Sequence, residues 1–181
     1  MIKAAVLTVS DTRERSNDLS GDRLVDLLIS SDAEIVERLI ITDELENISE
    51  TLFALASRDD INLIVTTGGT GFSPRDNTPE ATRAVIEREA PGLSEAMRRE
   101  TSVKTPMSML SRGICGIRGK VLIVNLPGSP KAVEECFEVI RPVLIHAINL
   151  LSGEQASKSH PFNRRDTPDA ISSVPYTDTE L

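Results

Sequence analysis

Cysteines and long apolar runs are scarce in this 181-residue chain. Cys115 and Cys136 form no CxxC pair, and only two histidines accompany them. This usage excludes a disulfide framework and a structural zinc site, and it favours a reducing compartment. No uncharged apolar run approaches the ~20 residues of a membrane span, and MIKAAVLTVSDT reaches an acidic residue too early for a signal peptide. We therefore expect a cytoplasmic protein without a membrane segment.

Aromatic residues and positive charge are also scarce. The chain has four Phe, one Tyr and no Trp, and its 20 Lys and Arg against 28 Asp and Glu leave a formal charge of -8. Nucleic-acid binding relies on base stacking and on neutralisation of phosphates, and both lack material here. Nucleic acid is therefore not an expected partner. Any phosphate ligand would have to be bound by local groups, against the sign of the whole molecule.

Apolar, β-branched runs alternate with segments of helical period. Strands are expected at 2–9, 35–41, 61–66 and 120–126. Helices are expected at 20–31, after Thr42 and Asp43, and at 79–89, 92–100 and 130–151, with Ser20 and Thr42-Asp43 at the N-termini of the first two. Because the strand at 61–66 is apolar almost throughout, it is typical of a sheet covered on both faces. The alternation predicts an α/β fold with a mostly parallel sheet.

Two segments do not follow this alternation. Residues 101–120 carry three glycines and no clean period, so no element is assigned to them. Residues 152–181 are poor in apolar side chains and contain three prolines, which favours an irregular tail. The predicted organisation is one domain at 1–151 followed by a C-terminal tail at 152–181.

The motif with the clearest chemical meaning is TTGGTGFSPRDNTPEA, residues 66–81, where the strand at 61–66 ends. Ligands of open α/β sheets bind at the carboxyl ends of strands. Gly68, Gly69 and Gly71 allow backbone N–H groups to approach an anion closely. The motif lacks the GK[ST] of a Walker loop and the third glycine of a dinucleotide fingerprint. A tight turn is the alternative interpretation.

The residues that follow the glycines favour a function over a simple turn. Thr78 and Pro79 fit the N-cap and the first position of a helix, whose N-terminus carries partial positive charge. Arg75 could bind a phosphate in bidentate fashion, and Asp76 could provide an oxygen ligand for magnesium. This dense series predicts a phosphate-binding site.

Other strand ends add residues to the same edge of the sheet. The turn LPGSPKA, residues 126–132, has Ser129 at a cap position and Pro130 at a first helical position. Asp11, Asp43 and Asp76 follow the first three strands, so they could gather around a magnesium ion that also binds phosphates. The alternatives are that Asp43 is an N-cap and that Asp11 is a solvated loop residue.

Four separated motifs resemble one known family. TTGGTGFSPRDNTPEAT, VSDT, SGDRL and LPGSPKAV are similar to the molybdenum-cofactor biosynthesis family Mog/MoaB and to the gephyrin and plant Cnx G domains, from about residue 3 to residue 151. The resemblance implies a three-layer αβα fold of the molybdopterin-binding kind. It also implies a homo-oligomer, usually a trimer, with MoaB-type members often hexameric.

The resemblance further implies an activity. Mog-type members adenylylate molybdopterin: its terminal phosphate attacks the α-phosphorus of ATP with the help of magnesium, pyrophosphate leaves, and a MoeA-like protein receives the product. The two essential aspartates of the family correspond to Asp43 and Asp76, as catalytic residues and metal ligands. The alternatives are a MoaB-type protein that binds molybdopterin or its precursor without turnover, and a scaffold with a vestigial pocket. The expected binding residues are Ser10, Asp11, Gly68, Gly69, Thr70, Gly71, Arg75, Gly128 and Ser129.

Overall fold

A six-stranded, mostly parallel sheet forms the centre of the computed structural model, which describes residues 1–153. Its strand order is β2-β1-β3-β6-β5-β4. β1 (Ile2–Val9), β2 (Ala33–Ile41), β3 (Leu63–Thr67) and β6 (Val121–Leu126) run parallel, whereas β4 (Arg88–Glu89) and β5 (Cys115–Arg118) pair antiparallel at one edge. All but the first two residues of the predicted tail lie outside the described residues.

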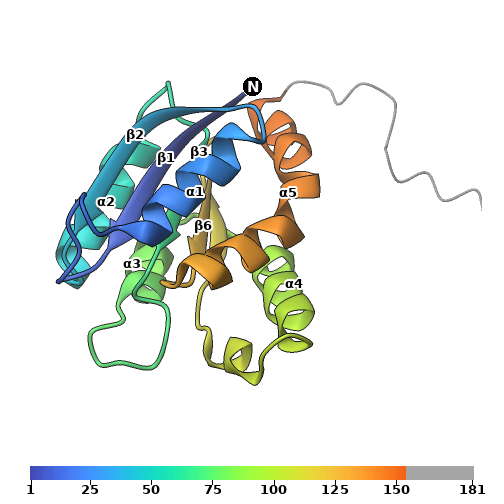
Figure 1. The fold of residues 1–181 in the computed structure, drawn as a ribbon. Helices are drawn as coiled ribbons and strands as arrows, with labels where there is room; N and C mark the ends of the chain where they lie inside the picture. Colours follow the sequence, from blue (N-terminus) through green and yellow to red (C-terminus); the bar gives the residue numbers. More distant parts are fainter. Residues whose placement is uncertain (154–181) are drawn as a thin grey trace, which may run out of the picture.

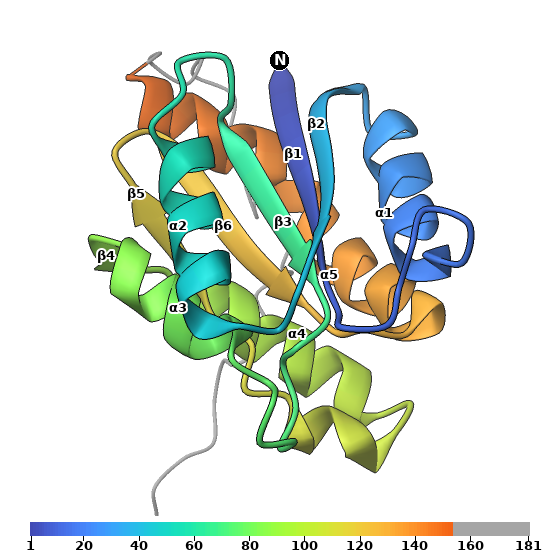
Figure 2. The same cartoon turned by 90° about the vertical axis from the view of Figure 1, so that its left-hand side faces the viewer.

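Helices cover both faces of this sheet (Figures 1 and 2). α1 (Leu19–Ile29), α4 (Pro91–Ser102) and α5 (Pro130–Ser152) belong to the core on one face. α2 (Leu45–Ala56) and α3 (Thr78–Val85) belong to the core on the other. Because successive side chains of a strand point to opposite faces of the sheet, Val6 of β1 packs in the first core and Leu7 in the second. The predicted three-layer α/β fold is confirmed.

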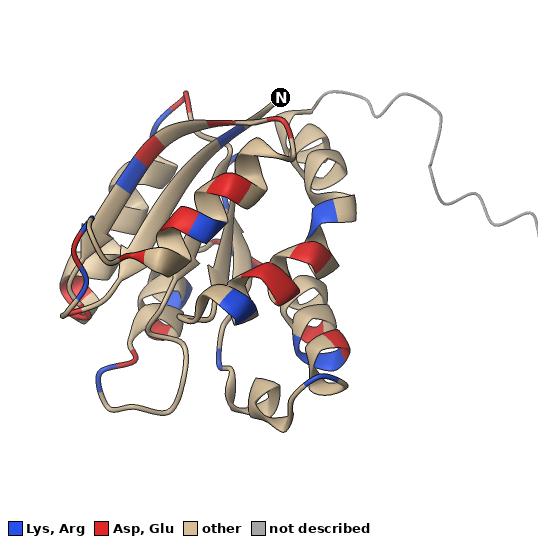
Figure 3. Cartoon of the chain, viewed as in Figure 1, with Lys and Arg blue, Asp and Glu red and all other residues tan. Residues whose placement is uncertain are grey.

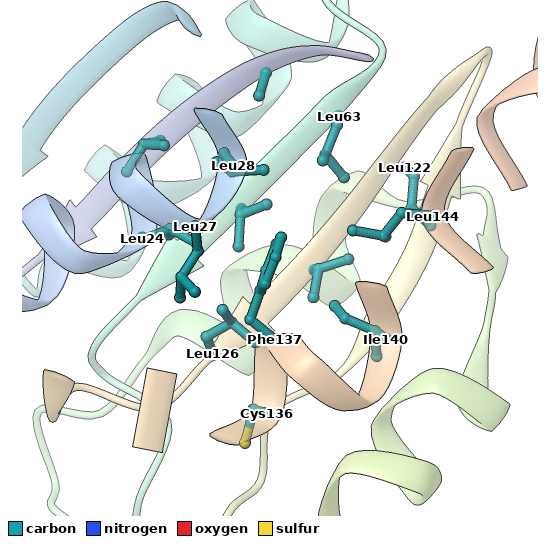
Figure 4. Packing of buried hydrophobic residues seen from close by; sticks show 14 of the residues in the cluster. Leu24, Leu27, Leu28, Leu63, Leu122, Leu126, Cys136, Phe137, Ile140 and Leu144 are labelled. Carbon is teal, nitrogen blue, oxygen red and sulfur yellow. The ribbon is translucent and has the colours of Figure 1, made fainter. Parts of the chain in front are cut away.

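The larger core is centred on Phe137 of α5, which is fully buried. In Figure 4 its ring lies among Leu24 and Leu27 of α1, Leu126 of β6 and Ile140 of its own helix. Because the same helix also packs against α4, α5 fastens both α1 and α4 to the sheet. The helix predicted at 130–151 is confirmed as α5.

Several element boundaries differ from the prediction. The helix expected at 79–89 ends at Val85, because Arg88 and Glu89 pair with Ile117 and Gly116 as β4. The unassigned segment holds the end of α4, a 3₁₀ helix η1 (Pro106–Leu110) and β5.

The expected caps also shift. Asp18, not Ser20, caps α1, and α2 begins at Leu45 after Glu44 rather than at Thr42-Asp43. Asp18 lies two residues before the expected cap, and its carboxylate accepts the Gly21 N–H. Thr42 and Asp43 belong to the connection between the end of β2 at Ile41 and the start of α2 at Leu45. For α1 and α2 the capping patterns therefore located the turns but not the first helical residues.

Charges of both signs are interspersed over the visible helices and loops (Figure 3). α1 and α5 each carry acidic and basic residues along one helix. No helix within residues 1–153 is long and apolar enough to cross a membrane.

Candidate functional site

The parallel strands end at one edge of the sheet, and four loops meet there. These loops follow β1, β2, β3 and β6, and they connect each strand to the next helix. In Figure 1 the loop between β3 and α3 and the segment around η1 both extend beyond this lower edge. The edge therefore brings together the motifs that the sequence separates by more than a hundred residues.

The loop after β3, residues 68–77, which we call the glycine loop, is folded back onto the start of α3. Gly68 and Gly69 have positive φ values of 103° and 62°, which side chains rarely tolerate. The Thr78 hydroxyl donates to the Gly68 carbonyl at 2.9 Å, and the Thr78 N–H donates to the Gly69 carbonyl at 3.1 Å. Thr78 is therefore not the N-cap that we expected: Asn77 precedes the helix, and Thr78 holds the glycine loop.

Three successive N–H groups in this loop have no acceptor in the described part of the chain. Gly69, Thr70 and Gly71 donate no hydrogen bond to another residue of 1–153, although their carbonyl groups accept several. Backbone N–H groups that point out of a turn form anion-binding concavities. The glycine loop therefore retains the donors that the sequence predicted for a phosphate.

The turn after β6 packs directly against the glycine loop. Gly68 N–H donates to the Leu126 carbonyl at 3.2 Å, and the Thr67 hydroxyl donates to the Pro127 carbonyl at 2.7 Å. A Cβ on Gly128 would lie 3.4 Å from the Gly68 Cα. Ser129 caps α5 as predicted, with its Oγ accepting from the Ala132 N–H at 3.2 Å.

Two of the predicted aspartates flank the glycine loop. Asp43 Oδ1 lies 3.2 Å from the position of a Cβ on Gly69, and Asp76 Oδ2 lies 2.9 Å from that of a Cβ on Gly71. Asp76 Oδ2 also accepts the Ser73 N–H at 2.9 Å. The catalytic pair that the resemblance implied is therefore held at both sides of the same backbone.

Asp11 contacts Asp43 through reciprocal hydrogen bonds. The Asp11 N–H donates to Asp43 Oδ2 at 2.9 Å, and the Asp43 N–H donates to Asp11 Oδ1 at 3.0 Å. Burial raises the pKa of Asp43, and the charges of Asp11 and Asp76 raise it further against the effects of the Asp11 N–H and Arg75. A cation beside Asp43 would relieve this cost.

Arg75 points to carboxylates of the loops that follow β1 and β2. Its Nε and Nη2 donate to Asp11 Oδ2 at 3.0 and 2.7 Å, and Nη1 lies 3.5 Å from Glu44 Oε1. The hydrogen bond from the Asp43 backbone and the Arg75 guanidinium lower the pKa of Asp11. The predicted phosphate-binding arginine is thus close to the glycine loop but engaged by Asp11.

The expected gathering of three carboxylates around one metal does not occur as a complete protein site. Within residues 1–153 no group of three or more His, Cys, Asp or Glu side chains is placed to hold a metal ion, because Asp11 turns its carboxylate to Arg75 and to the backbone of Asp43. Ser10 is also occupied locally: its Oγ accepts the Thr12 N–H at 3.3 Å.

A pocket of about 370 Å³ opens between the glycine loop, the turn after β6 and the region of α4 and η1. Its far wall comes from the end of α4 and from the segment that sequence patterns left unassigned. Five residues with hydroxyl groups line this far wall, together with Met97, Arg98 and Met107: Ser94, Thr101, Thr105, Ser108 and Ser111. Ser94, Met97 and Arg98 lie in the helix predicted at 92–100, but nothing in their sequence marked them as a pocket wall. The residues from Thr105 to Ser111 lie in the segment without a clean period, so their part of the wall could not be predicted.

Two arginines that the sequence did not single out also reach the site. Arg13 Nη2 donates to the Gly128 carbonyl at 2.5 Å, and its Nη1 donates to Ser20 Oγ at 2.5 Å. Arg112 donates to the glycine loop at several points. One sequence could not indicate these roles of Arg13 and Arg112, because the carbonyl groups of Gly128 and Gly71 that they bind are distant in the chain.

The fold and the site define a class: a three-layer α/β domain whose glycine loop offers backbone donors between two aspartates beside a pocket. A family model described as "Probable molybdopterin binding domain" matches residues 5–146. The chain belongs to this family, and the resemblance that the motifs carried is confirmed.

Individual relatives support the same assignment. The molybdenum cofactor synthesis protein cinnamon of Drosophila melanogaster is 46% identical over 84% of this chain, which spans only 26% of that protein. The molybdopterin adenylyltransferase of Helicobacter pylori strain J99 is 38% identical over 84% of this chain and 89% of its own length. The crystal structure of the molybdopterin biosynthesis enzyme MoaB of Thermus thermophilus has a TM-score of 0.79 and 44% identity over 84% of this chain and 98% of that one.

Proposed function

We propose that this protein is a molybdopterin adenylyltransferase of molybdenum cofactor biosynthesis. The terminal phosphate of molybdopterin attacks the α-phosphorus of ATP, the bond to the β-phosphate oxygen breaks, and pyrophosphate leaves. Relatives that carry this name cover most of the chain, which agrees with the prediction of an enzyme. A homotrimer and transfer of the product to a MoeA-like protein belong to the same proposal.

The observation that carries the proposal is the set of N–H groups of Gly69, Thr70 and Gly71, which have no acceptor within residues 1–153 and lie between Asp43 and Asp76. Donors fixed before the reaction stabilise charge that develops on phosphate oxygens, without further reorganisation. In phosphoryl-type transfer the protein contributes mainly position and charge, and good alignment is worth on the order of 7–11 kcal/mol. The glycine loop supplies both for the ATP phosphates.

Magnesium fits the residues that are present. Asp43 and Asp76 present carboxylate oxygens beside the glycine loop, and burial together with the charges of Asp11 and Asp76 raises the pKa of Asp43. Magnesium commonly binds one or two carboxylates together with phosphate oxygens, so a complete protein cage is not required. When bound, the ion neutralises charge on the phosphates. Asp43 and Asp76 would hold it and orient the attacking phosphate.

The pocket beside the glycine loop suits a pterin. Its volume of about 370 Å³ is within the range of small-molecule sites. Met97 and Met107 provide apolar surface for a flat ring, and the five hydroxyl groups provide partners for its polar edge. Gly69, Gly71 and Asp76 line the same pocket, so a phosphate at one end of the pterin would face the donors and the carboxylate.

Pyrophosphate release tests this proposal. The wild-type protein is expected to release pyrophosphate from ATP only when molybdopterin and magnesium are both present. Asp76→Asn is expected to slow the reaction by about 10²-fold or more at an unchanged melting temperature. Asp60→Asn, an exposed aspartate paired with Arg58, serves as the control and should retain the wild-type rate.

Two results would overturn the proposal. An unchanged rate in Asp76→Asn would remove the proposed role of the carboxylate. Tight binding of molybdopterin without any consumption of ATP would instead identify a binding protein without turnover, the alternative that the sequence left open.

A further inference from the structure

We propose that Arg112 is a positioning residue that sets the distance between the glycine loop and Asp76; this inference rests on the proposed function. Arg112 precedes β5, some forty residues after the glycine loop in the chain. Its own N–H donates to the Thr70 carbonyl at 2.8 Å. Its side chain then reaches further along the same loop.

The guanidinium of Arg112 joins the two ends of the loop excursion at 72–75. Nε donates to the Gly71 carbonyl at 2.6 Å, and Nη2 donates to the Asp76 carbonyl at 2.5 Å. Nη1 pairs with Glu80 Oε1 in the first turn of α3. One rigid group therefore contacts Gly71, the last glycine of the glycine loop, the backbone of Asp76 and the first turn of α3.

Arginine is suited to this task by its shape. The guanidinium is planar, and its N–H groups leave in fixed directions, so three acceptors in one plane can be held at once. A lysine keeps the charge but offers a single nitrogen, which cannot span Gly71, Asp76 and Glu80 together. The arrangement thus requires geometry as well as charge, and Lys and Arg should not be interchangeable here.

Arg112 acts through the loop rather than on the substrate. Gly71 and Asp76 line the 370 Å³ pocket between the loop and α4, but the side chain of Arg112 lies with Phe72, Pro74 and Glu80 around a different, open depression. A change at Arg112 should therefore displace the catalytic carboxylate and leave the surface that meets the pterin in place.

Arg112→Lys tests the inference, with Arg118→Lys as the matched control. Arg118 is the last residue of β5, is similarly buried and also donates to a carbonyl, that of Val85 at 2.8 Å, but its guanidinium packs over Phe53. Because small misplacements of reacting groups can cost about 10²-fold, Arg112→Lys should lower kcat by roughly 10- to 100-fold. The KM for molybdopterin should stay within about twofold, and half-maximal activity should need several-fold more magnesium. Arg118→Lys should match the wild type.

Hydrogen exchange separates this inference from the proposed function. The amides of Ser73 and Asp76 are bonded within the loop turn, so they should exchange at least about tenfold faster in Arg112→Lys and unchanged in Arg118→Lys. If the wild type transfers no adenylyl group, the proposed function fails while this measurement still decides the positioning. Unchanged exchange and unchanged kcat would overturn the inference, as would a raised KM at constant kcat.

Glu80 provides a second test that does not depend on Arg112→Lys alone. Within residues 1–153 its Oε1 pairs with Arg112 and its Oε2 has no hydrogen-bond partner, so Glu80→Gln changes mainly this pair. We expect a smaller loss of kcat in the same direction. The double variant should lose no more than Arg112→Lys, because the two residues act together. Additive losses would contradict the coupling.

Discussion

Replacing Gly68 with alanine probes the backbone on which the site is built. Gly68 has φ of 103°, and a Cβ there would lie 2.3 Å from the carbonyl oxygen of Val9, at the end of β1. That oxygen belongs to a central strand and cannot rotate away as a side chain can. The substitution must therefore separate the glycine loop from β1 or distort both.

The cost can be estimated from two effects. A backbone conformation normally reserved for glycine costs about 1–3 kcal/mol with a side chain, and overpacking against fixed atoms costs a further ~1–3 kcal/mol. The lower entropy of the unfolded alanine chain returns about 0.4–1 kcal/mol. The free energy of unfolding should therefore fall by roughly 1–6 kcal/mol, which at the upper end is a large part of the ~5–15 kcal/mol typical of a domain.

Gly119→Ala is the matched control. Its φ of 54° is also positive, but apart from its two chain neighbours no residue of 1–153 has an atom within 4 Å of the added Cβ. Only the conformational term applies, about 1–2 kcal/mol, so the net loss should be near 1 kcal/mol. Urea unfolding followed by far-ultraviolet circular dichroism, at one protein concentration for all variants, measures the difference. Equal midpoints for the two variants would refute the reasoning about the Val9 contact.

Three further predictions concern the core and the charges. Phe137→Ala should lower the free energy of unfolding by about 3–5 kcal/mol, because the ring is fully buried; a loss below ~1 kcal/mol in urea unfolding would contradict the packing. Asp18 is buried, and hydrogen bonds from Thr8, Gly21 and Arg38 outweigh burial and lower its pKa, so the stability it provides should be present above its usual pKa near 3.8 and be lost as pH falls below it. Acid titration of Asp18→Asn should lack that loss. Asp43 has a raised pKa, so its ionised form costs stability at neutral pH; Asp43→Asn should unfold at a higher urea midpoint at pH 7 while losing pyrophosphate release by about 10²-fold or more, and a lower midpoint would contradict the sign of the shift.

Much of the fold follows from periodicity because the central strands β1, β3 and β6 are buried on both faces. The run KVLIVNL predicted a strand at 120–126, and β6 is Val121–Leu126 with every residue buried. The helical period of the apolar residues at 130–151 likewise predicted α5, whose buried residues lie on one face of the helix. Patterns of this kind are local, so one sequence displays them.

The glycine loop and its two aspartates could also be placed from sequence, because parallel strands end at one edge of the sheet. The placement of Arg112 could not, since its acceptors are backbone carbonyls that any sequence provides. The contacts of Thr78 and Arg75 differ from the predicted helix cap and phosphate-binding arginine for a related reason. Thr78 bonds to Gly68 instead of capping α3, and Arg75 bonds to Asp11. Such contacts depend on how distant segments meet.

The acidic composition of the chain limits how the site can bind an anionic ligand. With a formal charge of -8, long-range attraction does not bring polyanions to the protein. The N–H groups of Gly69, Thr70 and Gly71, with magnesium at Asp43 and Asp76, would supply positive character within a few ångströms. Binding of ATP should consequently depend strongly on magnesium.

The most direct test of the account is the stoichiometry of the reaction. The protein is incubated with ATP, magnesium and molybdopterin, and pyrophosphate is measured beside adenylylated molybdopterin by mass spectrometry. Both products should appear in equal amounts, and a chelator of magnesium should abolish both. Molybdopterin that remains bound and unmodified beside intact ATP would contradict the proposed reaction.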